Sequence, residues 1–331
     1  MNPPKVDELD YIQFLVAAQK VFSAMEASKV HPDESAAVAH DAYTRLLQRV
    51  PPDSAALWTE VEPLVKREAG VLVLDDSTLD KPYARQMGLV SSHWSGKHGR
   101  VVEGINLISL VWTDGEATLP CDFRLYDKAQ DGLSKNEHVR AMIRTAKARG
   151  FAPRLVGFDS WYSGLDNLKL LRDCHWAWLT QLKSNRLVNA DGSGNRPISD
   201  SLIPPHGAVV HLKGYGWIKV FKTVDPHGNV EDWATSDLSM TIEQCAWLAL
   251  DVWQVDVYHR GLKQFTGIER AQFRLALAQR NHIGLALRAF VRLEAHRIRT
   301  NLSWCEAKAS IIRSAIRAYL TCPTITLNPT G

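Results

Sequence analysis

The stretch "GVLVLDD", from Gly70 to Asp76, is an apolar run that ends in two adjacent carboxylates. Short continuous apolar runs are typical of strands that are buried on both faces at the centre of a sheet. The residues at the end of such a strand can reach a cleft at the edge of the sheet. We therefore predict a central strand here, with Asp75 and Asp76 placed to enter a functional cleft.

The segments that follow predict the fold. The apolar segments 101–113 and 117–127 are joined by Asp114-Gly115, which is a strong hairpin signal. Helical periodicity then covers 133–150 and 164–173, and strands are predicted over 154–162 and 176–183. Three strands, two of which form a hairpin, followed by helix, strand, helix and strand are the order of a ribonuclease-H-like fold. We predict an α/β protein of this class, with a mixed sheet flanked by helices.

The remaining segments predict the domain organisation. Helical periodicity covers 9–25, 34–48 and 54–67, and two long helices are predicted over 241–263 and 275–300. Between 184 and 239, short alternating strands are mixed with Gly, Pro and Asn, which favours a β-rich insertion over a linker. The predicted divisions are a helical N-terminal region with a role in DNA binding (1–68), the first part of a catalytic core (69–184), the β-rich insertion (185–239), the helical completion of the core with a basic DNA-binding face (240–300) and a C-terminal tail (301–331).

Composition limits the class of protein. The 331 residues are 45% hydrophobic and 23% charged, as in ordinary globular proteins. The five cysteines are scattered and include no CxxC pair, which favours reduced thiols over a disulfide framework or a zinc site. The first residues lack the pattern of a signal peptide, and no apolar run reaches the ~18 residues of a membrane span. A cytoplasmic protein that does not enter a membrane is expected.

Three acids in this order suggest a catalytic site. Asp159 ends a later strand, and Asp256 lies in "WQVDVYHRGLKQ", from Trp253 to Gln264. Two Mg²⁺ ions ~3.5 to 4 Å apart can activate an attacking oxygen and stabilise a leaving one, and Mg²⁺ prefers oxygen ligands. Neighbouring strand residues point to opposite faces, so the first acid is either Asp76, which we prefer, or Asp75. Each acid alone also fits a turn or a helix cap, but the set of three favours metal-dependent phosphoryl transfer.

Five segments carry a family resemblance between about Leu72 and Glu294. The chain resembles a DDE transposase of an insertion sequence, in the IS4-like group. The resemblance implies a ribonuclease-H-like core interrupted by a β-rich insertion, and Mg²⁺-dependent cleavage at element ends through a hairpin intermediate, followed by strand transfer. It implies two Mg²⁺ ions, for which Mn²⁺ substitutes. The implied partners are terminal inverted repeats, target DNA and a second protomer in a synaptic complex, near the bacterial nucleoid. The segments are "LVLDDSTLDKP", "HWSGKHGRVVEGINLISLVWTDG", "FDSWY", "WQVDVYHRGLKQFTGIERAQ" and "AQRNHIGLALRAFVRLE".

The third acid departs from the pattern of that group, which is Tyr, two residues, Arg, three residues, Glu, six residues, Lys. Asp is one methylene shorter than Glu, so the helix must lie closer to the other acids or admit a bridging water. The alternative to an active transposase is therefore an inactive descendant that only binds DNA. Glu269 ranks lower as a third acid because it falls beyond the helix. With the acid at Asp256, the pattern falls on Ala249, Val252, Asp256 and Lys263, of which only the lysine matches.

Basic residues near Asp256 favour DNA as the partner. Nine Lys or Arg residues lie between Val257 and Arg299, against two acids. Such a charge excess is the electrostatic footprint of a protein that binds the phosphate backbone. The predicted DNA contacts are His259, Arg260, Lys263, Arg270 and, in a glycine-containing loop, Lys97 and Arg100.

Overall fold

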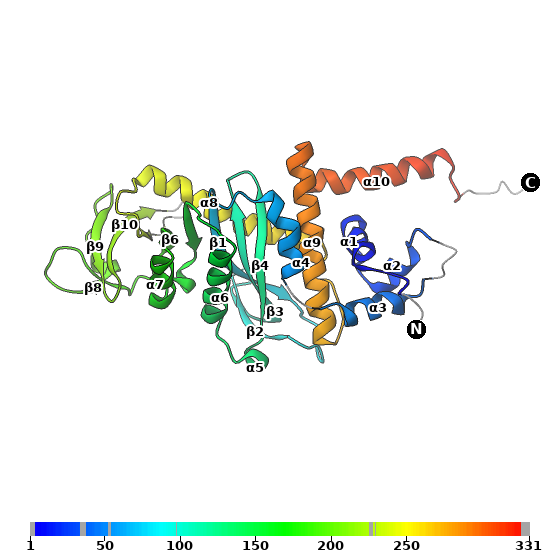
Figure 1. Cartoon of the computed structure of the whole chain (residues 1–331), viewed down its shortest axis with the longest axis horizontal. Coiled ribbons are helices and arrows are strands. Elements are labelled where there is room, and N and C mark those ends of the chain that lie inside the picture. The colour runs from blue at the N-terminus through cyan, green and yellow to red at the C-terminus, as the bar shows by residue number, and fades with distance from the viewer. Residues whose placement is uncertain are drawn as a thin grey trace, which may run out of the picture. The chain divides into compact units, whose positions relative to one another are not determined.

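The computed structural model describes residues 4–33, 38–51, 54–96, 98–224, 228 and 230–325. The chain divides into two compact units. The sheet unit comprises residues 54–85 and 89–259, and the helical unit comprises residues 1–53, 86–88 and 260–331 (Figure 1). None of the described helices combines the length and the apolar character that a membrane-crossing segment requires.

The centre of the sheet unit is strand β1, which contains the apolar run of the sequence. Val71 to Leu74 are fully buried, as expected for a strand covered on both faces. β1 pairs antiparallel with β3 and parallel with β5, while β4 pairs with β3 and β6 with β5. The resulting order β4-β3-β1-β5-β6 confirms the predicted ribonuclease-H-like core. The strand bounds are β1 Val71–Asp80, β2 Ser91–Ser95, β3 Arg100–Thr113, β4 Thr118–Tyr126, β5 Leu155–Phe158 and β6 Trp178–Gln181.

The segment predicted as a β-rich insertion continues the same sheet. Its last strand, β11, pairs antiparallel with β6, the outer strand of the core, through Leu179 and Thr235 among others. β10, β9, β7 and β8 follow outward in that order. Among the described residues, the core and the insertion thus form one eleven-stranded sheet. The bounds are β7 Leu187–Asn189, β8 Arg196–Pro197, β9 Ala208–Leu212, β10 Gly216–Val224 and β11 Val230–Thr235, with a short 3₁₀ helix η4 at Ile198–Asp200.

Helices cover both faces of the core sheet (Figure 1). Helix α6 begins with a capping box in which Ser134 and Glu137 satisfy each other's backbone N–H groups, and it packs on β3 and β4. Helix α8 lies against β5, where Val252 meets Gly157. The helices of this unit are α4 Ala55–Val61, α5 Lys128–Asp131, α6 Lys135–Ala148, α7 Leu165–Asp173 and most of α8 Ile242–Phe265, with 3₁₀ helices η2 Glu62–Leu64 and η3 Ser160–Tyr162.

The helical unit differs from the predicted helices at two places. The periodicity over 9–25 predicts one helix, but α1 ends at Ala17 and Ser23 caps a separate α2. Lys308 donates hydrogen bonds to the carbonyls of Leu15 and Ala18 at the end of α1, so a distant residue stabilises the break. Residues 34–37 of the second predicted helix lie outside the described residues. The segment 301–331, predicted only as a tail, contains a long helix. The bounds are α1 Glu8–Ala17, α2 Ala24–Lys29, α3 His40–Arg49, α9 Ala276–Thr300 and α10 Trp304–Thr321.

Candidate active site

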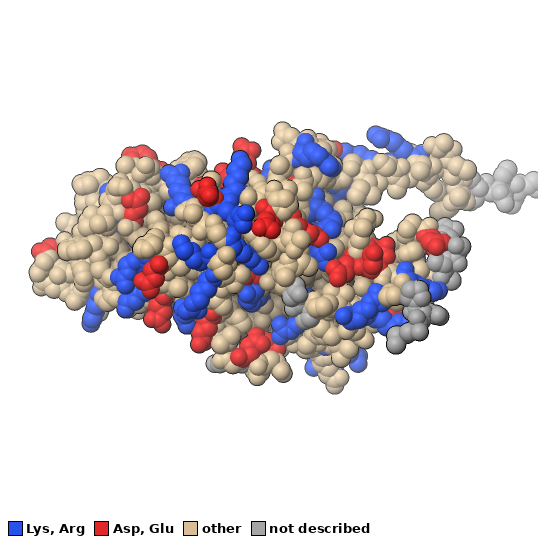
Figure 2. Space-filling model, viewed as in Figure 1, with Lys and Arg blue, Asp and Glu red and all other residues tan. Residues whose placement is uncertain are grey.

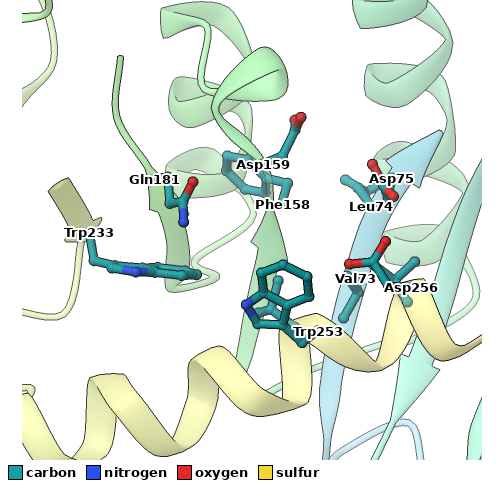
Figure 3. A pocket seen from close by; sticks show the side chains of 11 residues that line it. Val73, Leu74, Asp75, Phe158, Asp159, Gln181, Trp233, Trp253 and Asp256 are labelled. Atoms are coloured by element: carbon teal, nitrogen blue, oxygen red, sulfur yellow. The ribbon is translucent and has the colours of Figure 1, made fainter. Parts of the chain in front are cut away.

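Three carboxylates from three separate elements line one cavity in the sheet unit. Asp75 comes from β1, Asp159 follows the last residue of β5, and Asp256 lies on α8 (Figure 3). The cavity has a volume of about 260 Å³. Its other lining residues are Val73, Leu74, Phe158, Gln181, Trp233, Val252, Trp253 and Val255.

Strand register explains why the acids come together. In the parallel pair β1 and β5, Val73 lies opposite Gly157. Side chains two residues apart on a strand share a face. Asp75 and Asp159 are each two residues beyond this pair, so they lie on the same face as Val73 and Gly157. Helical residues four apart lie on one side of the helix, so Asp256 and Val252 both face the cavity from α8. The cavity therefore forms just beyond the last paired residues of β1 and β5, Leu74 and Phe158, where the two strands meet α8. The sequence predicts that β1 ends at the acids, but the strand continues to Asp80 because it stays paired with β3.

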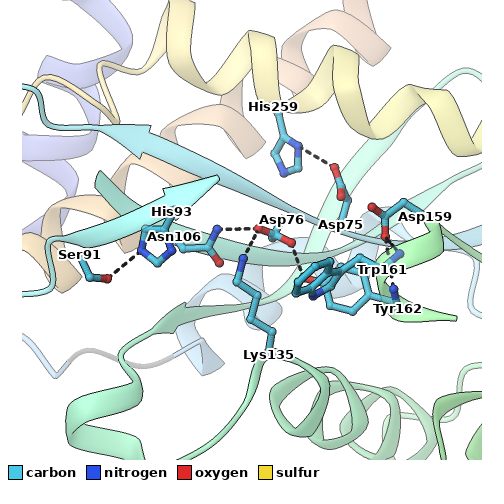
Figure 4. A network of polar contacts seen from close by, with 10 residues as sticks. All are labelled: Asp75, Asp76, Ser91, His93, Asn106, Lys135, Asp159, Trp161, Tyr162 and His259. Carbon is cyan, nitrogen blue, oxygen red and sulfur yellow. Dashed lines mark hydrogen bonds and ion pairs between the residues drawn. The ribbon is translucent and has the colours of Figure 1, made fainter. Parts of the chain in front are cut away.

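Asp76, the preferred first acid, points elsewhere. It accepts hydrogen bonds from Lys135 Nζ at 2.8 Å and Asn106 Nδ2 at 2.5 Å, and from the Tyr162 hydroxyl (Figure 4). Burial alone would raise the pKa of Asp76, but Lys135 and these hydrogen bonds outweigh it and hold the pKa below its usual value. Within the described part of the chain, Asp76 is not among the residues that line the cavity. The structure thus places the alternative, Asp75, in the cavity and Asp76 in a buried polar network.

His259, predicted to contact DNA, instead contacts the acid cluster. It is 6% exposed, and its Nδ1 lies 3.4 Å from Oδ2 of Asp75 (Figure 4). In the described residues, its Nε2 is buried without a hydrogen-bond partner. A buried ring nitrogen of this kind calls for a water molecule or a ligand. The position suits a residue that orients Asp75.

Asp159 has both a structural and an electrostatic role. Its Oδ1 accepts hydrogen bonds from the backbone N–H groups of Trp161 at 2.9 Å and Tyr162 at 3.4 Å, and so caps η3. Desolvation, followed by the negative charges of Asp75 and Asp76, raises the pKa of Asp159 to about 6. The residue is nevertheless exposed by surface area, so water screens part of this repulsion. Clustered negative charge at this point is typical of a site that receives a cation.

The donor set fits hard divalent cations. Asp75, Asp159 and Asp256 offer only carboxylate oxygens, the ligands that Mg²⁺ and Mn²⁺ prefer. Within the described ranges, no group of three His, Cys, Asp or Glu side chains lies close enough to hold a metal ion. The arrangement therefore fits ions that are each held by part of the set, with substrate or water oxygens completing the coordination, better than one ion shared by all three acids.

The other predicted DNA contacts lie in different settings. Arg260, Arg270 and Arg100 are exposed. Lys263 pairs with Glu269 at 2.9 Å, so the glutamate that ranked lower as a third acid neutralises a predicted phosphate contact. Lys97 lies outside the described residues. Figure 2 shows further Lys and Arg side chains in the region of α6, on which Arg144 and Lys147 are exposed.

Sequence reasoning missed the residues that support the acids. Tyr162 was visible in the "FDSWY" segment, where a tyrosine follows Asp159 by one turn. Lys135 and Asn106 carry no local signal, because they reach Asp76 from α6 and β3 across long sequence separations. Gly157 interrupts an otherwise apolar strand, which is a recognised sign of close backbone approach.

The fold and the cavity define a ribonuclease-H-like protein with a carboxylate site between its two central strands and α8. The sequence profile of the DDE superfamily endonuclease family matches residues 15–201, more than half of the chain, and the chain belongs to this family. Members of this superfamily generally use divalent metal ions. The match includes Asp75 and Asp159 and ends before Asp256.

A solved structure shares the fold. The chain is similar to a piggyBac transposase in a synaptic complex with hairpin DNA, with a TM-score of 0.52, 11% identity, and coverage of 96% of this chain and 73% of that one. No curated protein matches the chain in sequence. The IS4-like group suggested by the sequence motifs stays a prediction.

Proposed function

We propose that the protein is an insertion-sequence transposase that cleaves DNA at the ends of its element and joins those ends to target DNA. The observation that carries the proposal is the cavity that Asp75, Asp159 and Asp256 all line. Asp75 takes the place of Asp76 as the first acid, because it is Asp75 that lines the cavity. Membership of the endonuclease family and the likeness to a transposase support the same reaction class.

The three acids would hold two Mg²⁺ ions, or Mn²⁺ in their place. When bound, such ions activate an attacking oxygen and stabilise the charge on the leaving one. The protein residues fix the acids: His259 orients Asp75, and the backbone of η3 orients Asp159. Asp76, hydrogen-bonded to Lys135 and Tyr162, links the middle of β1 to α6 and to η3, the segment that follows β5.

DNA is the proposed substrate, as both the terminal inverted repeats and the target. Exposed arginines, including Arg100, Arg260 and Arg270, are available to phosphates. Trp253 and Trp161 are 55% and 56% exposed, and exposed aromatic rings can pack on unstacked bases. The compared transposase was solved as a synaptic complex, and we extend the proposal to two protomers acting together on paired ends, near the nucleoid.

The test of this function is a cleavage assay with the purified full-length chain. The substrate is a labelled duplex that carries the inverted repeats flanking the gene, incubated with Mg²⁺ or Mn²⁺. Nicks are expected at the repeat ends with the native chain. Asp256→Ala should abolish them and leave DNA binding intact. Asp173→Asn, at an exposed acid on α7, serves as the matched control and should cleave normally.

The alternative function is DNA binding without catalysis, by an inactive descendant. The observation that favours it is the aspartate at 256, where the resembled pattern has a longer acid. Retardation of the same duplex with no metal-dependent nick, unchanged by Asp256→Ala, would decide for this alternative and against the transposase.

A further inference from the structure

Helix α8 lies directly against β5 at Gly157. A Cβ atom added to Gly157 would stand 2.2 Å from Cγ2 of Val252, and 3.3 Å from both Cβ and Cγ1. Carbon atoms in ordinary contact are ~3.5 to 4.0 Å apart. Rotation of the Val252 side chain is disfavoured, because valine in a helix strongly prefers one rotamer, and its Cβ, at 3.3 Å, would still lie inside ordinary contact distance. With that rotamer kept, a side chain at 157 would push α8 outward by roughly 1.5 Å.

The contact between Gly157 and Val252 lies next to the carboxylates along both β5 and α8. Two residues of extended backbone, a rise of ~6.6 Å, lead from Gly157 past the last residue of β5 to Asp159. Four residues along α8, a rise of ~6 Å, lead from Val252 to Asp256. Both Val252 and Asp256 line the cavity. Because the helix between them is continuous, an outward shift at Val252 carries the Asp256 carboxylate away from Asp75 and Asp159.

The size of that shift matches a difference in side-chain length. Glutamate is longer than aspartate by one carbon–carbon bond, ~1.5 Å, which is the displacement that a methyl group at 157 would impose. An acid on α8 reaches the other two only when its length suits the distance of the helix from the sheet. Mg²⁺ tolerates little deviation in ligand distance, so a mismatch of this size would be felt.

We propose that Gly157 and Val252 are positioning residues, which hold α8 at the distance that lets an aspartate at 256 serve the metal site. Gly157 and Asp256 then form a matched pair: the missing side chain on the strand compensates for the short acid on the helix. This inference rests on the proposed function, because it takes the three acids as metal ligands. Neither Gly157 nor Val252 has a side-chain group that could bind a metal ion, so their role is to set the distance between β5 and α8.

The test is a double-mutant cycle that compares the native chain, Gly157→Ala, Asp256→Glu and the double variant. Mn²⁺ binding to each metal-free, full-length protein is measured by electron paramagnetic resonance titration. Each single variant should lose ~10-fold or more in Mn²⁺ affinity, as is common when the support of a metal ligand is altered. The double variant should return to within about threefold of the native affinity, which is a coupling that independent sites do not show.

A second variant keeps the test decisive if Gly157→Ala fails to fold. Gly157→Ala combined with Val252→Ala adds one methyl group on the strand and removes two from the helix. It should bind Mn²⁺ close to the native affinity, with Asp256 retained, because it removes the 2.2 Å contact and leaves only the 3.3 Å approach of the Cβ at 252. Circular dichroism and the thermal midpoint of every variant show whether the comparison is between folded proteins.

The outcomes separate the two proposals. If Gly157→Ala and the double variant lose the same Mn²⁺ affinity, the matched pair is overturned. A native chain that binds no Mn²⁺ would overturn it as well. If the Mn²⁺ pattern appears as expected but no variant nicks the repeat-end duplex, the matched pair stands and the transposase function fails.

Discussion

Two neighbouring acids on β1 should behave in opposite ways when each is changed to its amide. Three donors converge on Asp76: Lys135, Asn106 and Tyr162. An asparagine there would offer one acceptor oxygen and turn an NH₂ group toward donors. The side chains of Lys135 and Asp76 are 19% and 18% exposed, so the pair is partly buried, and removing one charge costs less than the ~3 to 5 kcal/mol of a fully buried pair. Asp76→Asn should therefore lower the free energy of unfolding by about 2 kcal/mol.

Asp75→Asn provides the matched control, because it changes the adjacent residue in the same way. Asp75 has one long contact with His259 and repels Asp159, so its replacement should change the free energy of unfolding by less than about 1 kcal/mol. It should, however, abolish Mn²⁺ binding and cleavage, whereas Asp76→Asn should retain Mn²⁺ binding at temperatures where it stays folded.

The assay combines urea unfolding at pH 7.5 without divalent metal, followed by tryptophan fluorescence, with Mn²⁺ titration of each variant. An Asp76→Asn variant as stable as the native chain would refute the structural role of Asp76. The assignment of Asp75 to the site is refuted if Asp76→Asn loses Mn²⁺ binding while Asp75→Asn keeps it, which would return Asp76 to the first position of the site.

Four further predictions follow from charges described above. Because the pKa of Asp159 is raised to about 6, protons compete with a cation below that pH, so the rise in thermal midpoint caused by Mn²⁺ should grow between pH 5.5 and 7.5. Because the pKa of Asp159 is higher in the folded than in the unfolded protein, ionisation of Asp159 destabilises the fold as the pH rises to 6 and above. Solvent reduces this penalty, since the residue is exposed, so Asp159→Asn should stabilise the metal-free protein by about 1 kcal/mol at pH 7.5 in urea unfolding. At pH 3.5 the substitution should have no effect. Lys308 is 4% exposed and donates to the carbonyls of Leu15, Ala18 and Phe265, so Lys308→Met should cost about 2 kcal/mol in the same assay; an unchanged urea midpoint would contradict this. Arg260→Ala should weaken DNA binding equally for all sequences and lower the slope of log affinity against log salt by about 1 in fluorescence anisotropy, whereas an unchanged slope would exclude Arg260 as a phosphate contact.

The core fold could be predicted because its signals are local. The apolar run of β1, the Asp114-Gly115 turn and the Ser134 cap each depend on a few adjacent residues. Their order along the chain then leaves one common topology. The insertion could be predicted as β-rich for the same reason, but its continuity with β6 depends on pairing across about fifty residues, and periodicity carries no information on that.

The identity of the first acid could not be predicted, because it depends on long-range packing. Alternation shows that Asp75 and Asp76 face opposite sides of β1, but not which side α8 covers. That choice is made by contacts such as Gly157 with Val252 and His259 with Asp75. The same limit applies to His259, which the sequence alone groups with the DNA-contacting residues of a basic helix, because its burial depends on long-range packing.

The pairing of β11 with β6 has a consequence for evolution and engineering. In an isolated core, β6 would be an edge strand with a row of unpaired backbone groups, which is a template for aggregation. The insertion therefore acts as a permanent cover for that edge, and residues 185–239 cannot be excised to make a smaller nuclease without leaving β6 exposed. A minimal version would need β11 retained as a tethered strand, or a charged or proline-bearing substitute along β6.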